Sequence, residues 1–407
     1  MLQVFVASFR SLSLFLLAFS PLDRSLVLVS HIPAFGPHQY IAASHDRRRV
    51  YTTTWGNPPT LHSWVVDGDA TSVSLINSTP ITSTSSYIAI PAPYTHIYST
   101  GGPTGEVHLI DPVSGGFSDK IQEFLFVSKD ELPLADKSRL ALRYGSHGIE
   151  FSSRFDLAFV PVLGTNSIEI YEHNTSTGLL THLSSSPSPR GPSAHDGPRH
   201  VKIHPNGRVL YCVTEHSNYV DAYTIASSPP HLTYHSSHSL VPPSLRDQSF
   251  RGDTLFVSPS TRALFTTTRG ATSRTRGWLS VFALDEGGLF LEDDPKFVER
   301  FETPTSGGKA NAIDVLSKST SVSTNSSYLI PGAHHMDLML QSPHANTGQD
   351  ESVWILLTDD DDYAVDNGGG LRVLEWDGWS AGGFKEVAAW PQDEKELLPG
   401  GSHAIWL

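Results

Sequence analysis

Seven short β-rich runs recur along the chain, and this internal repeat constrains the fold more than any other feature. Successive runs are 46 to 61 residues apart, except that the last interval is 90 residues. A period of roughly 40 to 50 residues is typical of β-propellers, in which each repeat forms one blade. The sequence therefore predicts an all-β, seven-bladed β-propeller. The runs are centred near Phe5, Tyr51, Tyr98, Phe159, Tyr211, Phe265 and Ile355.

Each run is followed, after a turn, by a second segment in which apolar and polar residues alternate, as at residues 167–171 and 219–223. We interpret the run as the inner strand of a blade and the segments after it as the outer strands. Residues 403–407 predict one further strand that has no blade of its own. Placing it in the N-terminal blade closes the ring and removes exposed edges. We therefore expect residues 1–407 to form a single propeller domain.

Two segments need a separate interpretation. Residues 12–19 have the length and the charged flank, Arg10, of a signal-peptide core. However, apolar runs at residues 4–6, 14–19 and 26–29 are separated by turn residues, which predicts three strands. We therefore expect residues 1–30 to belong to the ring and the protein to be cytoplasmic, with secretion as the alternative. Residues 316–328 are rich in Ser and Thr and predict a polar surface insertion.

The charge of the chain excludes some classes of partner. The sequence has 28 Lys and Arg against 42 Asp and Glu, a formal net charge of -14, and no run of basic residues. Nucleic acid and anionic membranes are therefore not expected partners. An anionic substrate would need a local cluster of Arg or His to overcome the overall field. The single cysteine, Cys212, lies in an apolar run and is expected to be buried.

Two segments carry the residues with a chemical interpretation: residues 144–151, which contain His147, and residues 197–218, which contain Arg199 and Glu215. They resemble the propeller lactonase family, which includes 6-phosphogluconolactonases and eukaryotic-type 3-carboxy-cis,cis-muconate lactonizing enzymes. The resemblance covers nearly the whole chain. It implies an axial site made by His147, Arg199, Glu215 and Arg269, each from a different blade. Residues 304–313 resemble the lactonizing branch, which adds Asn311 as a substrate-binding residue.

The resemblance implies a cofactor-independent isomerase, a carboxy-cis,cis-muconate cyclase that forms a γ-lactone in aromatic compound catabolism through the protocatechuate/β-ketoadipate pathway. Arg199 and Arg269 suit the binding of a small polycarboxylate, because guanidinium groups form bidentate bonds to carboxylates. We expect His147 to be the general acid, oriented by Glu215, since its ordinary pKa is close to neutral. Glu215 is the alternative acid if desolvation raises its pKa.

Two other functions remain open at this point: a lactone hydrolase of the 6-phosphogluconolactonase type, and a non-catalytic propeller that serves as an interaction platform. The sequence predicts neither a cofactor nor a metal site. It leaves open the exact substrate, the stereochemistry and whether the chain forms a homo-oligomer. The remaining motifs carry a structural interpretation: His200 and His204, an exposed turn at Asp359–Asp362, the pair His334 and His335, and a hairpin at residues 368–370.

Overall fold

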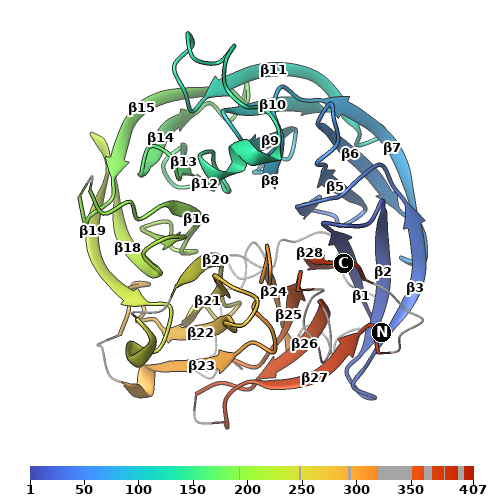
Figure 1. Cartoon of the computed structure of the whole chain (residues 1–407). Helices are drawn as coiled ribbons and strands as arrows, with labels where there is room; N and C mark the ends of the chain where they lie inside the picture. Colours follow the sequence, from blue (N-terminus) through green and yellow to red (C-terminus); the bar gives the residue numbers. More distant parts are fainter. Residues whose placement is uncertain are drawn as a thin grey trace.

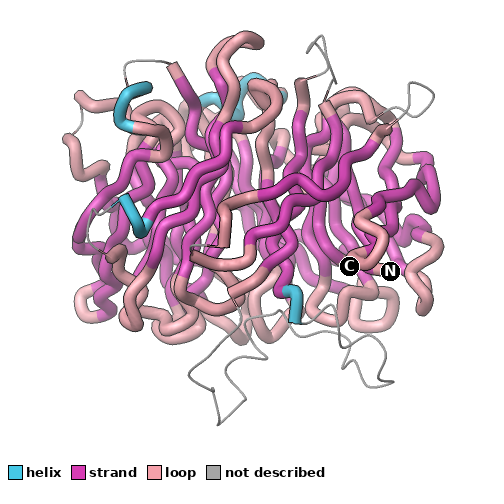
Figure 2. The backbone as a smooth tube through the Cα atoms, turned by 90° about the horizontal axis from the view of Figure 1, so that it is seen from below, coloured by secondary structure: helices cyan, strands magenta, loops and turns pink. Residues whose placement is uncertain are grey.

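Seven four-stranded antiparallel sheets surround a central axis in a computed structural model of the chain (Figure 1). The structure describes residues 1–191, 193–246, 249–291, 295–319, 351–361, 369–379, 381–392 and 398–407. Turned by 90°, the strands stand roughly along the axis, with loops at both ends (Figure 2). The prediction of an all-β, seven-bladed propeller is confirmed.

In six blades the strands run in chain order from the axis outward, and in the remaining blade the last strand of the chain lies innermost, followed by the first three. The innermost strands are β4 (Ile41–Ala43), β8 (Ser85–Ala89), β12 (Glu150–Ser152), β16 (Pro198–Ile203), β20 (Phe250–Val257), β24 (Ile313–Ser317) and β28 (Gly401–Trp406). The second strands are β1 (Leu2–Ser8), β5 (Arg49–Thr53), β9 (His96–Gly101), β13 (Leu157–Val162), β17 (Val209–Thr214), β21 (Ala263–Gly270) and β25 (Val353–Asp359).

The third strands are β2 (Ser13–Ser20), β6 (Thr60–Val66), β10 (Thr104–Ile110), β14 (Ser167–His173), β18 (Tyr219–Ser227), β22 (Trp278–Ala283) and β26 (Gly370–Trp376). The outermost strands are β3 (Ser25–Pro33), β7 (Val73–Pro80), β11 (Phe117–Leu125), β15 (Leu180–Pro187), β19 (Pro230–Ser239), β23 (Val298–Glu302) and β27 (Lys385–Trp390). Three short 3-10 helices, η1 (Arg139–Arg143), η2 (Pro243–Leu245) and η3 (Pro295–Phe297), complete the described elements. None of these helices is long and apolar enough to cross a membrane.

The seven β-rich runs are the second strands, so our interpretation of them as inner strands is wrong. A second strand has sheet neighbours on both edges and adjacent blades on both faces, and it is therefore buried along most or all of its length. Phe5, Tyr51 and Phe159 are at most 1% exposed. The innermost strands give a weaker signal because they are short or carry polar side chains that face the channel.

The two chain ends meet in one blade, as predicted. Strand β28 pairs with β1 in an antiparallel register that places Ile405 opposite Phe5. All eight residues of β2 are buried, so residues 13–19 of the apolar segment lie in the core of this blade, whereas Leu12 is exposed. Within the described residues, the buried apolar side chains form seven clusters, each made by facing surfaces of two neighbouring blades.

Two loop predictions need correction. The predicted insertion at residues 316–328 starts too early, because Leu316 and Ser317 pair with β25 and are buried. Its part from residue 320 onward, like His334 and His335, lies outside the described residues. The three described residues of Asp359–Asp362 are buried instead of exposed. Their carboxylates are held by partners from other segments: Arg372 pairs with Asp359, Arg10 with Asp360 and Ser306 with Asp361.

Candidate active site

The predicted site residues gather at one end of the axial channel. All innermost strands run in the same direction, and each second strand returns antiparallel to its neighbour. The end where innermost strands begin is therefore also the end where second strands finish, and we call it the entry mouth. Arg199 is the second residue of β16, Glu215 directly follows β17 and Arg269 is the last residue but one of β21. Strands β16 and β17 belong to the same sheet, so the prediction that each site residue comes from a different blade is wrong for Arg199 and Glu215. His147 precedes β12, and Asn311 precedes β24.

Arg199 and Arg269 are linked by two carboxylates. Glu215 accepts a hydrogen bond from Nη1 of Arg199 at 2.6 Å, and its other oxygen lies 3.3 Å from Nη2 of Arg269. Asp253 Oδ1 lies 2.8 Å from Nη2 of Arg199 and 3.2 Å from Nε of Arg269. All four side chains are nearly buried, with at most 10% of each exposed. The two arginines therefore have fixed positions before any ligand binds.

Two further members of this cluster, Asp253 and Arg251, were not predicted from the sequence. Both lie on β20, two residues apart, and Nη1 of Arg251 donates a hydrogen bond to Glu215 at 3.0 Å. Residues two apart on a strand point to the same side. A pair of opposite charges with this spacing, inside a segment that carries large apolar residues, was the signal that could have identified them. Because residues 250–257 were not recognised as the strand next to the axis, the spacing alone did not indicate that the two side chains reach the site.

His147 is held in one tautomer by its own loop. Its Nε2 lies 2.8 Å from the carbonyl oxygen of Leu142. Since a carbonyl oxygen can only accept, Nε2 carries the proton and donates a hydrogen bond. Nδ1 is buried and has no hydrogen-bond partner among the described residues. Burial, followed by the charge of Arg199, lowers the pKa of His147 to about 3. The ring is therefore neutral at pH 7, and its free lone pair can accept a proton.

Glu215 has the opposite electrostatic character. Burial acts to raise its pKa, but the charges of Arg199 and Arg269 outweigh burial and hold the pKa of Glu215 well below its usual range. Burial also lowers the pKa of the Arg269 guanidinium. The site therefore contains a permanent carboxylate between permanent cations, next to a neutral imidazole. A bound anion would raise the pKa of both groups, and the ordinary pKa of histidine is the one close to neutrality.

Asn311 lies under the cluster. Its side-chain amide donates to the carbonyl oxygen of Thr268 at 2.9 Å, and its backbone N–H donates to Asp253 at 2.7 Å. The side chain is fully buried, and its Oδ1 has no hydrogen-bond partner among the described residues. Asn311 therefore fixes the loop before β24 against the carboxylate that orients both arginines. A direct contact with substrate stays a prediction.

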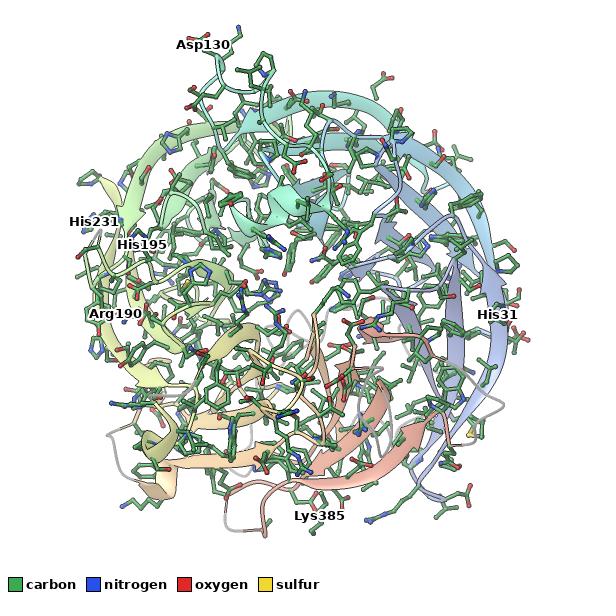
Figure 3. The ribbon with its side chains drawn as sticks, in the orientation of Figure 1. His31, Asp130, Arg190, His195, His231 and Lys385 are labelled. Carbon is green, nitrogen blue, oxygen red and sulfur yellow. The ribbon has the colours of Figure 1, made fainter. Side chains whose placement is uncertain are left out.

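A cavity of about 440 Å³ is lined by residues of the innermost strands, and none of the five predicted site residues is part of its wall. Its wall includes His200 and Lys202 of β16, and Lys202 pairs with Glu150 of β12 at 2.9 Å. Side chains project from the innermost strands toward the axis, whereas labelled residues such as His31 and Lys385 lie at the outer rim (Figure 3). In the described part of the chain, no group of three or more His, Cys, Asp or Glu side chains is arranged to hold a metal ion.

Comparison with known proteins gives a family match and several named relatives. Residues 6–303 match the family model described as "Lactonase, 7-bladed beta-propeller". The chain is 31% identical over 319 residues to "Muconate cycloisomerase 1" of Cutaneotrichosporon cutaneum, covering 77% of this chain and 83% of that protein. It is 32% identical over 136 residues to the "Carboxy-cis,cis-muconate cyclase" of Neurospora crassa, which covers 30% of this chain and 34% of that protein.

The chain is also more distantly similar to a protein named as a lactonase and to a solved propeller structure. A "6-phosphogluconolactonase" of Pectobacterium carotovorum is 26% identical over 147 residues, which covers 36% of this chain and 42% of that protein. The structure of a periplasmic gluconolactonase of Pseudomonas aeruginosa superimposes with a TM-score of 0.72 at 15% identity, covering 100% of this chain and 99% of that one. The family match spans well over half of the chain, and the protein therefore belongs to the seven-bladed β-propeller lactonase family.

Proposed function

We propose that this lactonase-type propeller enzyme is a cycloisomerase that converts 3-carboxy-cis,cis-muconate into a γ-lactone. The observation that carries the proposal is the pair of buried arginines, Arg199 and Arg269, which two carboxylates hold beside a neutral histidine. The similarity to proteins named as muconate cycloisomerase and carboxymuconate cyclase supports this choice of substrate.

The proposed reaction is an intramolecular conjugate addition. An oxygen of one substrate carboxylate attacks an alkene carbon, and the electron pair of the alkene moves toward the neighbouring carboxylate. One C–O bond forms, negative charge collects on that neighbouring group, and one proton is then added to carbon. The net change is the uptake of one proton per turnover. Guanidinium N–H groups of Arg199 and Arg269 stabilise the developing charge, and each charged hydrogen bond contributes about 1.5 to 3 kcal/mol.

His147 supplies the proton in this scheme. Its Nδ1 must first take up a proton, which a pKa of about 3 prevents in the unliganded protein. A substrate with three carboxylates offsets the charge of Arg199 and so raises the pKa of the ring when it binds. Glu215 stays ionised throughout, because Arg199 and Arg269 hold its pKa low. It orients the cations and does not act as the acid.

A specific observation also favours lactone hydrolysis as the second candidate. A neutral His147 with a free Nδ1 is suited to remove a proton from water, which would then attack a lactone carbonyl. The arginines would hold the anionic group of the lactone. This reaction splits one C–O bond, adds water and releases one proton.

The test is to incubate purified protein separately with 3-carboxy-cis,cis-muconate and with 6-phosphogluconolactone. We expect turnover of the muconate, loss of that turnover in Arg269→Met, and a decrease in kcat larger than the change in KM in His147→Asn. Circular dichroism confirms that both variants are folded. Wild-type rates in both folded variants would refute the site, whereas activity on 6-phosphogluconolactone alone would replace the reaction with the second candidate.

A further inference from the structure

Two arginines lie directly opposite each other at the entry mouth. In the pairing of β20 with β21, Arg251 is the partner of Arg269. Like charges at directly opposed positions of an antiparallel pair destabilise a sheet. Here one oxygen of Glu215 lies between them, 3.0 Å from Nη1 of Arg251 and 3.3 Å from Nη2 of Arg269. The guanidinium groups of Arg251 and Arg269 therefore lie side by side and share the carboxylate of Glu215.

The two arginines differ in exposure. The side chain of Arg269 is 10% exposed, whereas that of Arg251 is 51% exposed although β20 is otherwise nearly buried. Arg269 is within ion-pair distance of both Glu215 and Asp253. Among the described residues, Glu215 is the single carboxylate within ion-pair distance of Arg251. Since a guanidinium group has five N–H donors, Arg251 keeps donors available on its solvent side.

The charges of the cluster leave room for a further anion. Three guanidinium groups, those of Arg199, Arg251 and Arg269, face the carboxylates of Glu215 and Asp253, so the cluster has an excess of one positive charge. In the proposed reaction, one substrate carboxylate is the nucleophile and a second accepts the developing charge. The third takes no part in bond making. Because this third carboxylate is negatively charged, it requires a cationic partner, and Arg251 is exposed at the rim of the site.

We propose that Arg251, together with Arg269, binds the third carboxylate of the substrate and thereby sets the preference of the site for tricarboxylates over dicarboxylates. The inference rests on the proposed function for the nature of the substrate. Arg251 is a binding residue for the group that does not react, so its loss removes affinity for one carboxylate and leaves the chemistry of the other two in place. Arg199 and Arg269 continue to hold Glu215 when Arg251 is replaced.

The experiment compares Arg251→Gln with a matched control, Arg276→Gln. Arg276 lies in the turn between β21 and β22 at the same mouth, is 58% exposed and pairs with one carboxylate, that of Glu302, at 3.6 Å. Steady-state kinetics are measured on 3-carboxy-cis,cis-muconate and on cis,cis-muconate, which lacks the third carboxylate. In Arg251→Gln, kcat/KM should decrease about 10- to 100-fold for the tricarboxylate, as expected for one lost charged hydrogen bond, and less than about 3-fold for the dicarboxylate.

A binding measurement makes the result independent of turnover. Calorimetric titration with tricarballylate and with glutarate compares saturated acids with three and two carboxylates. The wild-type protein and Arg276→Gln should bind tricarballylate more tightly, and Arg251→Gln should lose that preference. Arg251→Lys, which keeps the charge but not the bidentate geometry, should be intermediate and serves if the glutamine variant does not fold.

The outcomes separate this inference from the proposed function. If Arg251→Gln lowers kcat/KM and affinity equally for both classes of acid, or for neither, Arg251 does not discriminate and the inference is wrong. If the wild-type protein converts neither muconate but shows an Arg251-dependent preference for tricarballylate, the inference holds and the proposed reaction fails. Equal binding of tricarballylate and glutarate by the wild-type protein overturns the inference whichever reaction is found.

Discussion

At the scale of single residues, Asp253 and Glu215 determine how the cationic site is held together. Each carboxylate lies within 3.3 Å of both Arg199 and Arg269. Buried guanidinium groups that lose one partner leave an uncompensated charge, which costs far more than an exposed ion pair contributes. The carboxylates therefore serve both to stabilise the entry mouth and to orient the groups that meet the substrate.

Asp253→Asn tests this double role. The substitution keeps the size of the side chain but removes one of two negative charges shared by the buried arginines. We expect the free energy of unfolding to fall by about 3 kcal/mol and kcat/KM to fall at least about 100-fold. Urea unfolding and steady-state kinetics measure the two effects. Asp130→Asn is the control, because Asp130 is exposed at the outer rim (Figure 3) and its replacement should change neither. Full activity in Asp253→Asn would contradict the orienting role.

Only part of this cluster could be predicted from the sequence. His147, Arg199, Glu215 and Arg269 were found because the motifs around them resemble those of a family, and the structure brings all four to one mouth. Arg251 and Asp253 were missed because residues 250–257 mix Arg, Gly, Asp and Thr with apolar residues and do not alternate regularly. Their role depends on which strand of the blade lies next to the axis, and a local hydrophobic pattern does not indicate which strand that is.

At the scale of strands, hydrophobic patterns identify the middle of each blade better than its edges. The second strands are buried on both faces and gave seven clear runs, whereas β4 and β12 have three residues each. A three-residue strand is below the length at which a period can be recognised. The number of blades predicted from the sequence is therefore correct, but the strand predicted to lie next to the axis is the second strand of every blade.

Strand β20 must approach the end of β17 closely for the site to form. Gly252 donates its N–H to the carbonyl oxygen of Glu215 at 3.0 Å. A Cβ atom at this position would lie 2.2 Å from the carbonyl oxygen of Thr214. Gly252→Ala therefore has to push β20 away from β17, which separates Arg251 and Asp253 from Glu215.

We expect Gly252→Ala to lower kcat/KM at least about 10-fold, because displacements of about 1 Å in a preorganised site cost this much or more. The propeller should remain folded, with a lower thermal midpoint. Gly68→Ala is the matched control, since a Cβ atom at Gly68 meets nothing within 4 Å. Equal kinetics for the two variants would show that β20 can move without affecting the site.

At the scale of the whole molecule, closure of the ring joins the two ends of the chain. Trp406 of β28 and Phe19 of β2 pack in one cluster with Trp390 of the preceding blade. The prediction of closure was correct because the last residues form a strand that can pair only where an edge is open. The boundaries of loops were predicted less well. Asp359, Asp360 and Asp361 are buried through partners distant in sequence, which a local run of acidic residues cannot reveal.

The same packing buries many histidines, and it makes a prediction about acid stability. Burial, followed by the charge of His62, lowers the pKa of His38 to about 3. Burial also lowers the pKa of His403 to about 3, and that of His108 to about 4. With His147, these side chains are neutral in the folded protein down to well below pH 6, whereas an unfolded chain protonates histidine near pH 6.5.

The sign of the pH dependence follows from proton binding. Between about pH 6.5 and pH 4, the unfolded chain binds more protons than the folded one, so the free energy of unfolding falls as the pH is lowered. This stability is fully present above pH 6.5. One such histidine contributes a slope of about 1.4 kcal/mol per pH unit within the window, and several together should remove several kcal/mol between pH 7 and pH 5. Buried carboxyls with raised pKa values, such as that of Asp314, offset part of this loss.

Urea unfolding at pH 7.5, 6 and 5 measures the slope, and His38→Gln should reduce it by about one proton. His38 is fully buried and its Nδ1 lies 3.0 Å from the carbonyl oxygen of Thr53. The variant can be less stable at every pH, but the slope depends only on the number of protons taken up. His231→Gln should leave the slope unchanged, because His231 is exposed at the outer rim (Figure 3). A free energy of unfolding that stays constant from pH 7.5 to pH 5 would show that the buried histidines exchange protons in the folded protein.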